Sequence, residues 1–105
     1  MSEHLPDLGH FSDPALLIMA SLAGGPKHGY AMMEDIDTFA QVRLGPGTLY
    51  GALARLEQRG WIAPLPSEER RRPYSLTAAG AVALRAQLAS LEQVAALGLR
   101  RLAAL

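Results

Sequence analysis

The last 29 residues of the chain constrain its fold more than any other segment, because they carry one uninterrupted apolar repeat. Apolar residues recur there at alternating steps of four and three: Leu84, Leu88, Leu91, Ala95, Gly98, Leu102 and Leu105. This heptad pattern is typical of a helix whose seam packs on another helix. Capped by Thr77, such a helix is about 40 Å long, too long for a small domain to cover. We expect its first turns to pack on the core and the remainder to form a homodimer interface.

Two shorter helices are expected near the start of the chain. The first follows Ser12 or Asp13 as its capping residue, begins at Pro14 and ends before the Gly24–Gly25 pair. Residues of these types are favoured at helix boundaries. Its interior, ALLIMASLA, is apolar nearly all round, which is typical of a buried helix.

The second helix is expected from about Gly29 to Phe39, after a turn at Gly25–Pro26. We interpret its methionines as core residues, because flexible thioether side chains fill irregular gaps. The predicted inner face consists of Met32, Met33, Ile36 and Phe39. The acidic residues are expected to face water: Glu34, Asp35 and Asp37.

A third helix, PGTLYGALARLEQ, has an unusual composition. Gly45 and Pro46 suit its start, and Gly60 suits the left-handed residue after its end. One face is apolar and must pack inward: Leu49, Ala52, Leu53 and Leu56. The opposite face is formed mainly by small residues with polar residues at its edges: Gly47, Gly51, Ala54 and Gln58, flanked by Thr48, Tyr50 and Arg55. Small residues let a helix backbone approach a surface closely, as in the major groove of DNA.

Two short β-like runs, WIAPL and PYSL, follow this helix and are separated by PSEERRR. Pro64 and Pro73 are poor residues for central strands but are tolerated at sheet edges, so an exposed two-stranded hairpin is expected. The whole order predicts a mainly α fold with a small β-hairpin. It is the order of a winged helix-turn-helix followed by a long C-terminal dimerisation helix.

The charge of the chain is zero overall but unevenly distributed. Residues 1–40 carry a net charge of −5, residues 41–76 carry +3, and residues 77–105 carry +2. Such a bias can create a local positive face on a neutral protein.

The absence of cysteine excludes disulfides and thiolate metal sites and fits a reducing compartment. The sequence shows neither the layout of a signal peptide nor a membrane-spanning run, so a cytoplasmic protein is expected.

Catalytic and metal-binding chemistries fit the sequence poorly. Gly45 and Gly47 resemble the start of a dinucleotide-binding loop, but Tyr50 stands where the third glycine is required, and a hairpin follows instead of a second parallel strand. The serines lie in no nucleophile elbow. The three histidines are scattered, without metal-ligand spacing. We expect a protein that is not an enzyme and that needs no metal or cofactor.

Three segments, in order, resemble the signature regions of the PadR family of bacterial transcriptional regulators. They are LLIMASLAGGPKHGYAMMEDI, LGPGTLYGALARLEQRGWI and RRPYSLTAAG, within residues 14–80. The combination of HGY, PGTLY, L-RLE--G and Y-LT--G, in this order, is highly specific for this family. The single terminal helix resembles the compact branch of the family. The resemblance implies a homodimeric repressor that binds a pseudo-palindromic operator. It also implies that a small hydrophobic or aromatic effector often relieves the repression.

The resemblance, together with the charge distribution, implies a set of DNA-binding residues. PGTLY starts the recognition helix, HGY opens the preceding helix, whose N-terminus can hold a phosphate, and the arginine run forms the wing tip. The DNA-binding candidates are Lys27, His28, Tyr30, Arg43, Gly47, Thr48, Tyr50, Gly51, Arg55, Arg70, Arg71 and Arg72. For Tyr50, DNA contact and packing are equally supported. Tyr30 and Tyr74 can also be core residues, and the arginine run can be a solvated turn. The dimer-interface candidates are Leu84, Leu88, Leu91, Ala95, Leu102 and Leu105.

The sequence departs from the usual family pattern in three places. Gly45 stands where serine is frequent, so a side-chain cap is absent, and Pro73 removes one strand donor. The final helix contains no aromatic residue, whereas such residues hold a flat effector in some relatives. Here Trp61 and Phe11 are the aromatic residues available for an effector.

The expected organisation is an N-terminal arm (1–12), a winged helix-turn-helix domain (13–76) and a dimerisation helix (77–105). Two functions are consistent with it. The first is a dimeric repressor that binds double-stranded DNA. The second is a winged-helix module that binds a protein partner through its leucine-rich and acidic helices.

Overall fold

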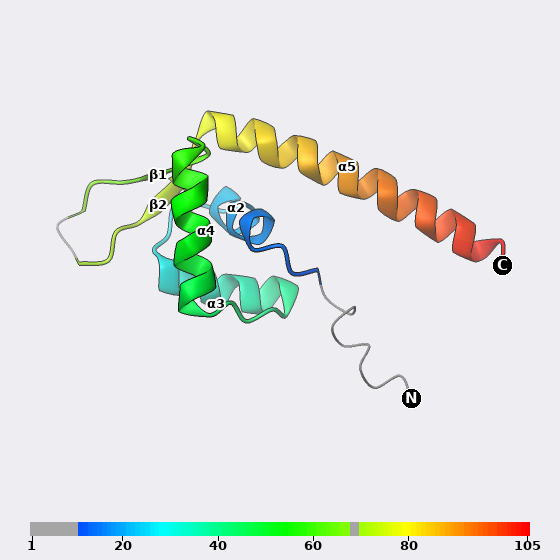
Figure 1. Ribbon diagram of the computed structural model, residues 1–105, viewed down its shortest axis with the longest axis horizontal. Coiled ribbons are helices and arrows are strands. Elements are labelled where there is room, and N and C mark those ends of the chain that lie inside the picture. The colour runs from blue at the N-terminus through cyan, green and yellow to red at the C-terminus, as the bar shows by residue number, and fades with distance from the viewer. Residues whose placement is uncertain (1–10, 68–69) are drawn as a thin grey trace.

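The computed structural model describes residues 11–67 and 70–105 (Figure 1). The described chain contains four helices and one hairpin: α2 (Pro14–Ala23), α3 (Gly29–Ala40), α4 (Pro46–Gln58), β1 (Ile62–Pro64), β2 (Tyr74–Leu76) and α5 (Ala78–Ala103). This order confirms the predicted mainly helical fold with a small hairpin and a long terminal helix. The predicted N-terminal arm, apart from its last two residues, lies outside the described residues.

Helix α2 is the central element of the core. Asp13 caps it as predicted, with its carboxylate accepting from the Ala15 amide at 3.1 Å, and Gly25, just after its end, has a φ of +132°. The helix packs against α3, α4, α5 and β2. Because it is enclosed on several sides, it buries six residues: Leu16, Leu17, Ile18, Met19, Ser21 and Leu22.

Helix α3 begins at the predicted residue and ends at Ala40, one residue later than expected. The prediction that Phe39 belongs to the inner face was wrong, and Asp35 has a contact that was not predicted. Phe39 is 48% exposed, because the buried face follows Gly29, Met32 and Ile36 and Phe39 lies at the margin of that face in the last turn. Asp35 does not simply face water, since its carboxylate accepts a hydrogen bond from the buried Ser21 hydroxyl at 2.7 Å.

Helix α4 has the predicted boundaries and the predicted inner face. Gly45 caps it without a side-chain bond, Pro46 occupies the first turn, and Gly60 has a φ of +76° after its end. Its apolar face is fully enclosed against α2 and the first strand: Leu49, Ala52, Leu53 and Leu56 are each at most 1% exposed.

The hairpin is antiparallel, with Ile62 opposite Leu76 and Pro64 opposite Tyr74. Tyr74 exchanges both of its backbone hydrogen bonds with Lys27, in the turn before α3. The backbone N–H and C=O of Tyr74 point away from β1, toward Lys27. Pro64 lies opposite Tyr74 and lacks an N–H, so this lack costs no hydrogen bond between the two strands. The bridge between Lys27 and Tyr74 was not predicted from the sequence.

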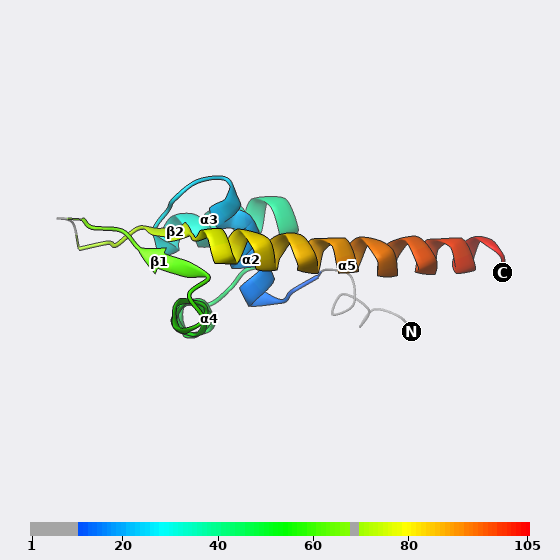
Figure 2. The same cartoon turned by 90° about the horizontal axis from the view of Figure 1, so that it is seen from above.

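Helix α5 leaves the body of the molecule in the direction opposite to the hairpin (Figures 1 and 2), and the longest extent of the molecule is 57 Å. Thr77 caps it as predicted, and only Gly80 and Leu84 are buried along it. Gly80 lies against the backbone carbonyl of Trp61, where a Cβ atom would collide. The expectation that only the first turns pack on the core is therefore confirmed. Within the described ranges, no helix has the length and apolarity needed to cross a membrane.

Candidate nucleic-acid interface

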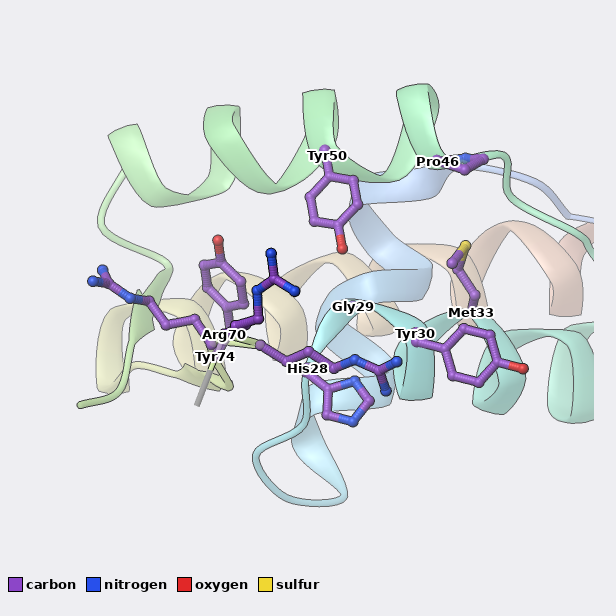
Figure 3. A pocket seen from close by; sticks show the side chains of 10 residues that line it. His28, Gly29, Tyr30, Met33, Pro46, Tyr50, Arg70 and Tyr74 are labelled. Atoms are coloured by element: carbon purple, nitrogen blue, oxygen red, sulfur yellow. The ribbon is translucent and has the colours of Figure 1, made fainter. Parts of the chain in front are cut away.

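A basic cleft of about 490 Å³ lies between the hairpin and the N-terminal ends of α3 and α4 (Figure 3). Three segments that are distant in sequence contribute to it. The structure thereby brings together six of the predicted DNA-binding residues: His28, Tyr30, Tyr50, Arg70, Arg71 and Arg72. Three further residues and Gly29 complete the lining and were not among the candidates: Met33, Pro46 and Tyr74.

Tyr50 projects from α4 toward the start of α3 (Figure 3). A Cβ atom at Gly29 would lie 2.7 Å from the Tyr50 hydroxyl and 3.1 Å from Cδ2 of Leu49, so a larger residue there would displace the Tyr50 ring from this position. Tyr50 nevertheless remains 53% exposed. Its ring therefore packs on Gly29 while its surface remains accessible from the cleft.

The wing contacts α3 through Arg71 and Tyr30. The Arg71 guanidinium carbon lies 5.8 Å from the centroid of the Tyr30 ring, within cation–π range. Tyr30 is 54% exposed and is not a core residue. Within the arginine run, Arg71 thus has a defined neighbour in the lining of the cleft.

The small-residue face of α4 is open. A Cβ atom at Gly47 would meet no heavy atom within 4 Å, and one at Gly51 would meet Arg55 Nη1 at 3.6 Å. Thr48 and Arg55 are exposed. These four candidates lie outside the lining of the cleft, on the surface of the same helix. The surface thus has two parts, an open helix face and an arginine-lined cleft beside it.

Three basic candidates differ in how far their side chains are already engaged. Lys27 is directed inward, with its ammonium 2.6 Å from the Ser21 carbonyl oxygen. His28 caps α3, because its Nδ1 accepts from the Ala31 amide at 3.3 Å. Arg43 is 89% exposed, with Nε 3.4 Å from a carboxylate oxygen of Asp37.

The predicted interface residues of α5 fall into two groups. Leu84 is 5% exposed and belongs to the core of its own chain. The other members are exposed, on α5 or, for Leu105, just after its end: Leu88, Leu91, Ala95, Leu102 and Leu105. The described residues therefore leave a leucine stripe uncovered over the outer part of the helix.

Trp61, one of the two aromatic residues considered for an effector, lines a cavity of about 270 Å³ between α2, the end of α4 and α5. The Arg59 guanidinium lies 5.1 Å from the centroid of the Trp61 ring. Phe11 is 48% exposed. Among the residues that the structure describes, no group of three histidines and acids is arranged to hold a metal.

The sequence of residues 18–86 matches the model of the Transcriptional regulator PadR-like family. The chain belongs to this family. A PadR family transcription regulator from Clostridium difficile has a similar structure, with a TM-score of 0.74 and 25% identity over 80% of this chain and 92% of that one. A transcriptional regulator from Clostridium thermocellum is similar over 80% of this chain and 84% of that one, with a TM-score of 0.72 and 29% identity.

A curated relative from Streptomyces fradiae, a 37.1 kDa protein in transposon Tn4556, is 49% identical over 69 residues. The match covers 66% of this PadR-family chain but spans only a fifth of that relative's length. The family and the two structures are those of transcriptional regulators, in agreement with the prediction that the chain is not an enzyme.

Proposed function

We propose that this PadR-family regulator is a cytoplasmic, homodimeric repressor that binds a pseudo-palindromic operator in double-stranded DNA. The observation that carries the proposal is the open small-residue face of α4 beside an arginine-lined cleft. Helices with glycine at such positions can lie close to base edges, while basic side chains beside them meet the phosphates.

In the proposed complex, α4 enters the major groove and presents Gly47, Thr48, Gly51 and Arg55 to the DNA. Tyr50 contacts the rim of the groove from its place over Gly29. His28 and the N-terminus of α3 meet a neighbouring phosphate, because the first amides of a helix attract anions. Arg43, in the loop before α4, is a further phosphate contact.

The wing arginines contact the adjacent backbone or minor groove in this proposal. Arg71 stacks on Tyr30 in the free protein, so its guanidinium is held near the groove before DNA arrives. Preordering of this kind reduces the entropy lost on binding. The supporting fact is that Arg70, Arg71 and Arg72 line the same cleft as His28 and Tyr50.

The proposed dimer is formed by the exposed leucine stripe of α5. Leu88 and Leu102 are 43% and 63% exposed in the single chain, and burying apolar area of this kind contributes about 25 cal/mol per Å². A twofold dimer places two recognition helices on two half-sites, which is why a palindromic operator is expected. A small hydrophobic or aromatic effector that binds beside Trp61, between α4 and α5, would alter the distance between the two recognition helices.

The proposal is tested by selecting genomic fragments that the purified protein binds and by footprinting the enriched ones. A shared palindrome protected on both half-sites is expected. Enrichment without any shared palindrome would contradict the repressor proposal. If the protein instead retained a protein partner and no DNA at low salt, the winged-helix interaction module would be the better interpretation.

Arg71→Ala tests whether the wing contacts a phosphate. Binding to the selected operator is expected to weaken steeply with salt, since counterions are released from the DNA. If Arg71 neutralises one phosphate, the slope of log K against log salt falls by about one unit in the variant. Fluorescence anisotropy at several salt concentrations measures the slope. An unchanged slope would remove Arg71 from the contacts.

A further inference from the structure

The turn between α2 and α3 contains an ammonium group that protein oxygens surround. Lys27 Nζ donates to the carbonyl oxygens of Ser21 at 2.6 Å and Gly25 at 3.3 Å, and it lies 3.8 Å from Oδ2 of Asp35. The side chain is only 22% exposed. An ammonium has three N–H donors; two of them bond to these carbonyl oxygens, and the Asp35 carboxylate is an ion-pair partner beyond hydrogen-bond distance. In this arrangement the ammonium is directed toward its own chain and its charge is already paired with a carboxylate.

The oxygens around Lys27 are themselves fixed by the fold. Ser21 is 1% exposed, and its hydroxyl donates to the same Asp35 Oδ2 at 2.7 Å. Its carbonyl lies in the last turn of α2, where the helix dipole favours a cation. Asp35 lies in the middle of α3. One charged group therefore joins the end of α2 to α3.

The backbone of Lys27 holds the hairpin. Its N–H donates to the Tyr74 carbonyl at 3.2 Å, and its carbonyl accepts from the Tyr74 N–H at 3.0 Å. This antiparallel bridge lies on the edge of β2 that is not paired with β1. Tyr74 is the first residue of β2 and comes directly after Arg70–Pro73. The direction in which the wing arginines leave the sheet thus depends on where Lys27 is held.

We propose that Lys27 is a positioning residue for DNA binding, whose enclosed ammonium fixes the α2–α3 turn so that its backbone orients the wing. The proposal rests on the proposed DNA binding and replaces the phosphate contact that the family resemblance implied for Lys27. The two roles predict opposite effects for Asp35. If Lys27 reached a phosphate, removal of the Asp35 charge would free the ammonium and strengthen DNA binding. If Lys27 orients the wing, the same change weakens DNA binding.

Asp35→Asn and Lys27→Met are compared with Glu34→Gln, which removes a charge from an exposed position on the same helix. Glu34→Gln is expected to strengthen binding slightly, because repulsion of the phosphates decreases. Asp35→Asn and Lys27→Met are each expected to weaken operator binding about tenfold, or about 1.4 kcal/mol. Their combined effect is expected to be close to that of either alone, since both act through one cluster. The salt slope is expected to remain that of the wild type.

Two results would assign Lys27 to a phosphate and overturn the proposal. One is that Asp35→Asn binds the operator as tightly as Glu34→Gln does. The other is that the salt slope of Lys27→Met is lower by about one unit. If Lys27→Met does not fold, Asp35→Asn alone decides between the two roles.

Amide hydrogen exchange tests the same role without DNA. The amides of Lys27 and Tyr74 are expected to exchange faster in both variants, because their bridge opens more often. The amide of Thr77, which donates to the Trp61 carbonyl at 3.0 Å at the other end of the hairpin, is the internal control and is expected to change little. Unchanged exchange at Lys27 and Tyr74 contradicts the positioning role. If the variants exchange as expected but the wild-type protein binds no DNA, the proposed function is contradicted instead.

Discussion

Helices α4 and α5 carry similar apolar patterns, but the single chain covers them very differently. The apolar face of α4 is at most 1% exposed at every position. Among the leucines of α5 only Leu84 reaches comparable burial, while Leu91 is 37% exposed and Leu102 is 63% exposed. An apolar period therefore indicates which face of a helix will be buried, but not which molecule will bury it.

The length of α5 explains the difference. Its 26 residues extend for about 39 Å, whereas the two shorter extents of the whole molecule are 31 and 20 Å. Helix α4, with 13 residues, fits alongside α2. The outer turns of α5 have no such neighbour in the described chain, as Figure 2 shows.

The largest expected contrast comes from the same truncation on the two helices. Leu53→Ala removes a side chain that is 1% exposed on α4 and is expected to cost about 2–5 kcal/mol of unfolding free energy. Leu102→Ala, at a 63% exposed position of α5, is expected to cost less than about 0.5 kcal/mol in dilute solution. Urea unfolding measures both.

Protein concentration sharpens this test. If a second copy covers α5, the cost of Leu102→Ala rises with concentration, because dimerisation stabilises only the folded chain. The cost of Leu53→Ala is not expected to depend on protein concentration in this way, because Leu53 is buried within its own chain. Equal costs for the two variants at high dilution would contradict the difference between the helices.

The second contrast is between two faces of α5. Leu88→Glu combined with Leu91→Glu places charges in the exposed stripe and is expected to yield monomers, because charges in an apolar interface lose their hydration. Val82→Glu is the control, since Val82 is 65% exposed and lies off the stripe. Sedimentation velocity measures the oligomeric state. A dimer that survives the double substitution would place the interface elsewhere.

The parts of the fold that depend on near neighbours were predictable from the sequence. Asp13 and Pro14 at the start of α2, and Gly60 after α4, act within one helical turn, so their types alone indicate the boundaries. The same holds for the inner face of α4, which follows from its 3.6-residue period. The open opposite face of α4, with Gly47 and Gly51, is predictable in the same way.

The contacts between distant segments were not predictable. Ser21 and Asp35 are 14 residues apart, and the bridge between Lys27 and Tyr74 joins the helix-turn-helix to the hairpin. Neither pairing leaves a local signal, because it depends on how whole elements pack. Lys27 was a candidate for DNA binding because of its charge, but the direction of its side chain depends on a carboxylate from another helix. The close approach of the Tyr50 ring to Gly29 arises in the same way, from the packing of α4 on α3.

The smallest expected effect concerns the open face of α4. Gly51→Ala adds a Cβ whose nearest neighbour is Arg55 Nη1, at the ordinary contact distance of 3.6 Å. Because alanine favours a helix more than glycine, the variant is expected to gain about 0.5–1 kcal/mol of stability. Operator affinity is expected to fall about tenfold, since the methyl group holds the backbone away from the bases. Thermal unfolding and anisotropy measure the two effects.

Ser90→Ala provides the matched control for this last contrast. It also raises helix propensity, at an exposed position on α5 away from the heptad seam, and is expected to leave operator affinity unchanged. A Gly51→Ala protein that is more stable and binds the operator as tightly as the wild type would show that this face of α4 does not approach the bases. Weaker binding together with higher stability arises only if α4 needs glycine for its partner, since the fold of the free chain has room for the methyl group.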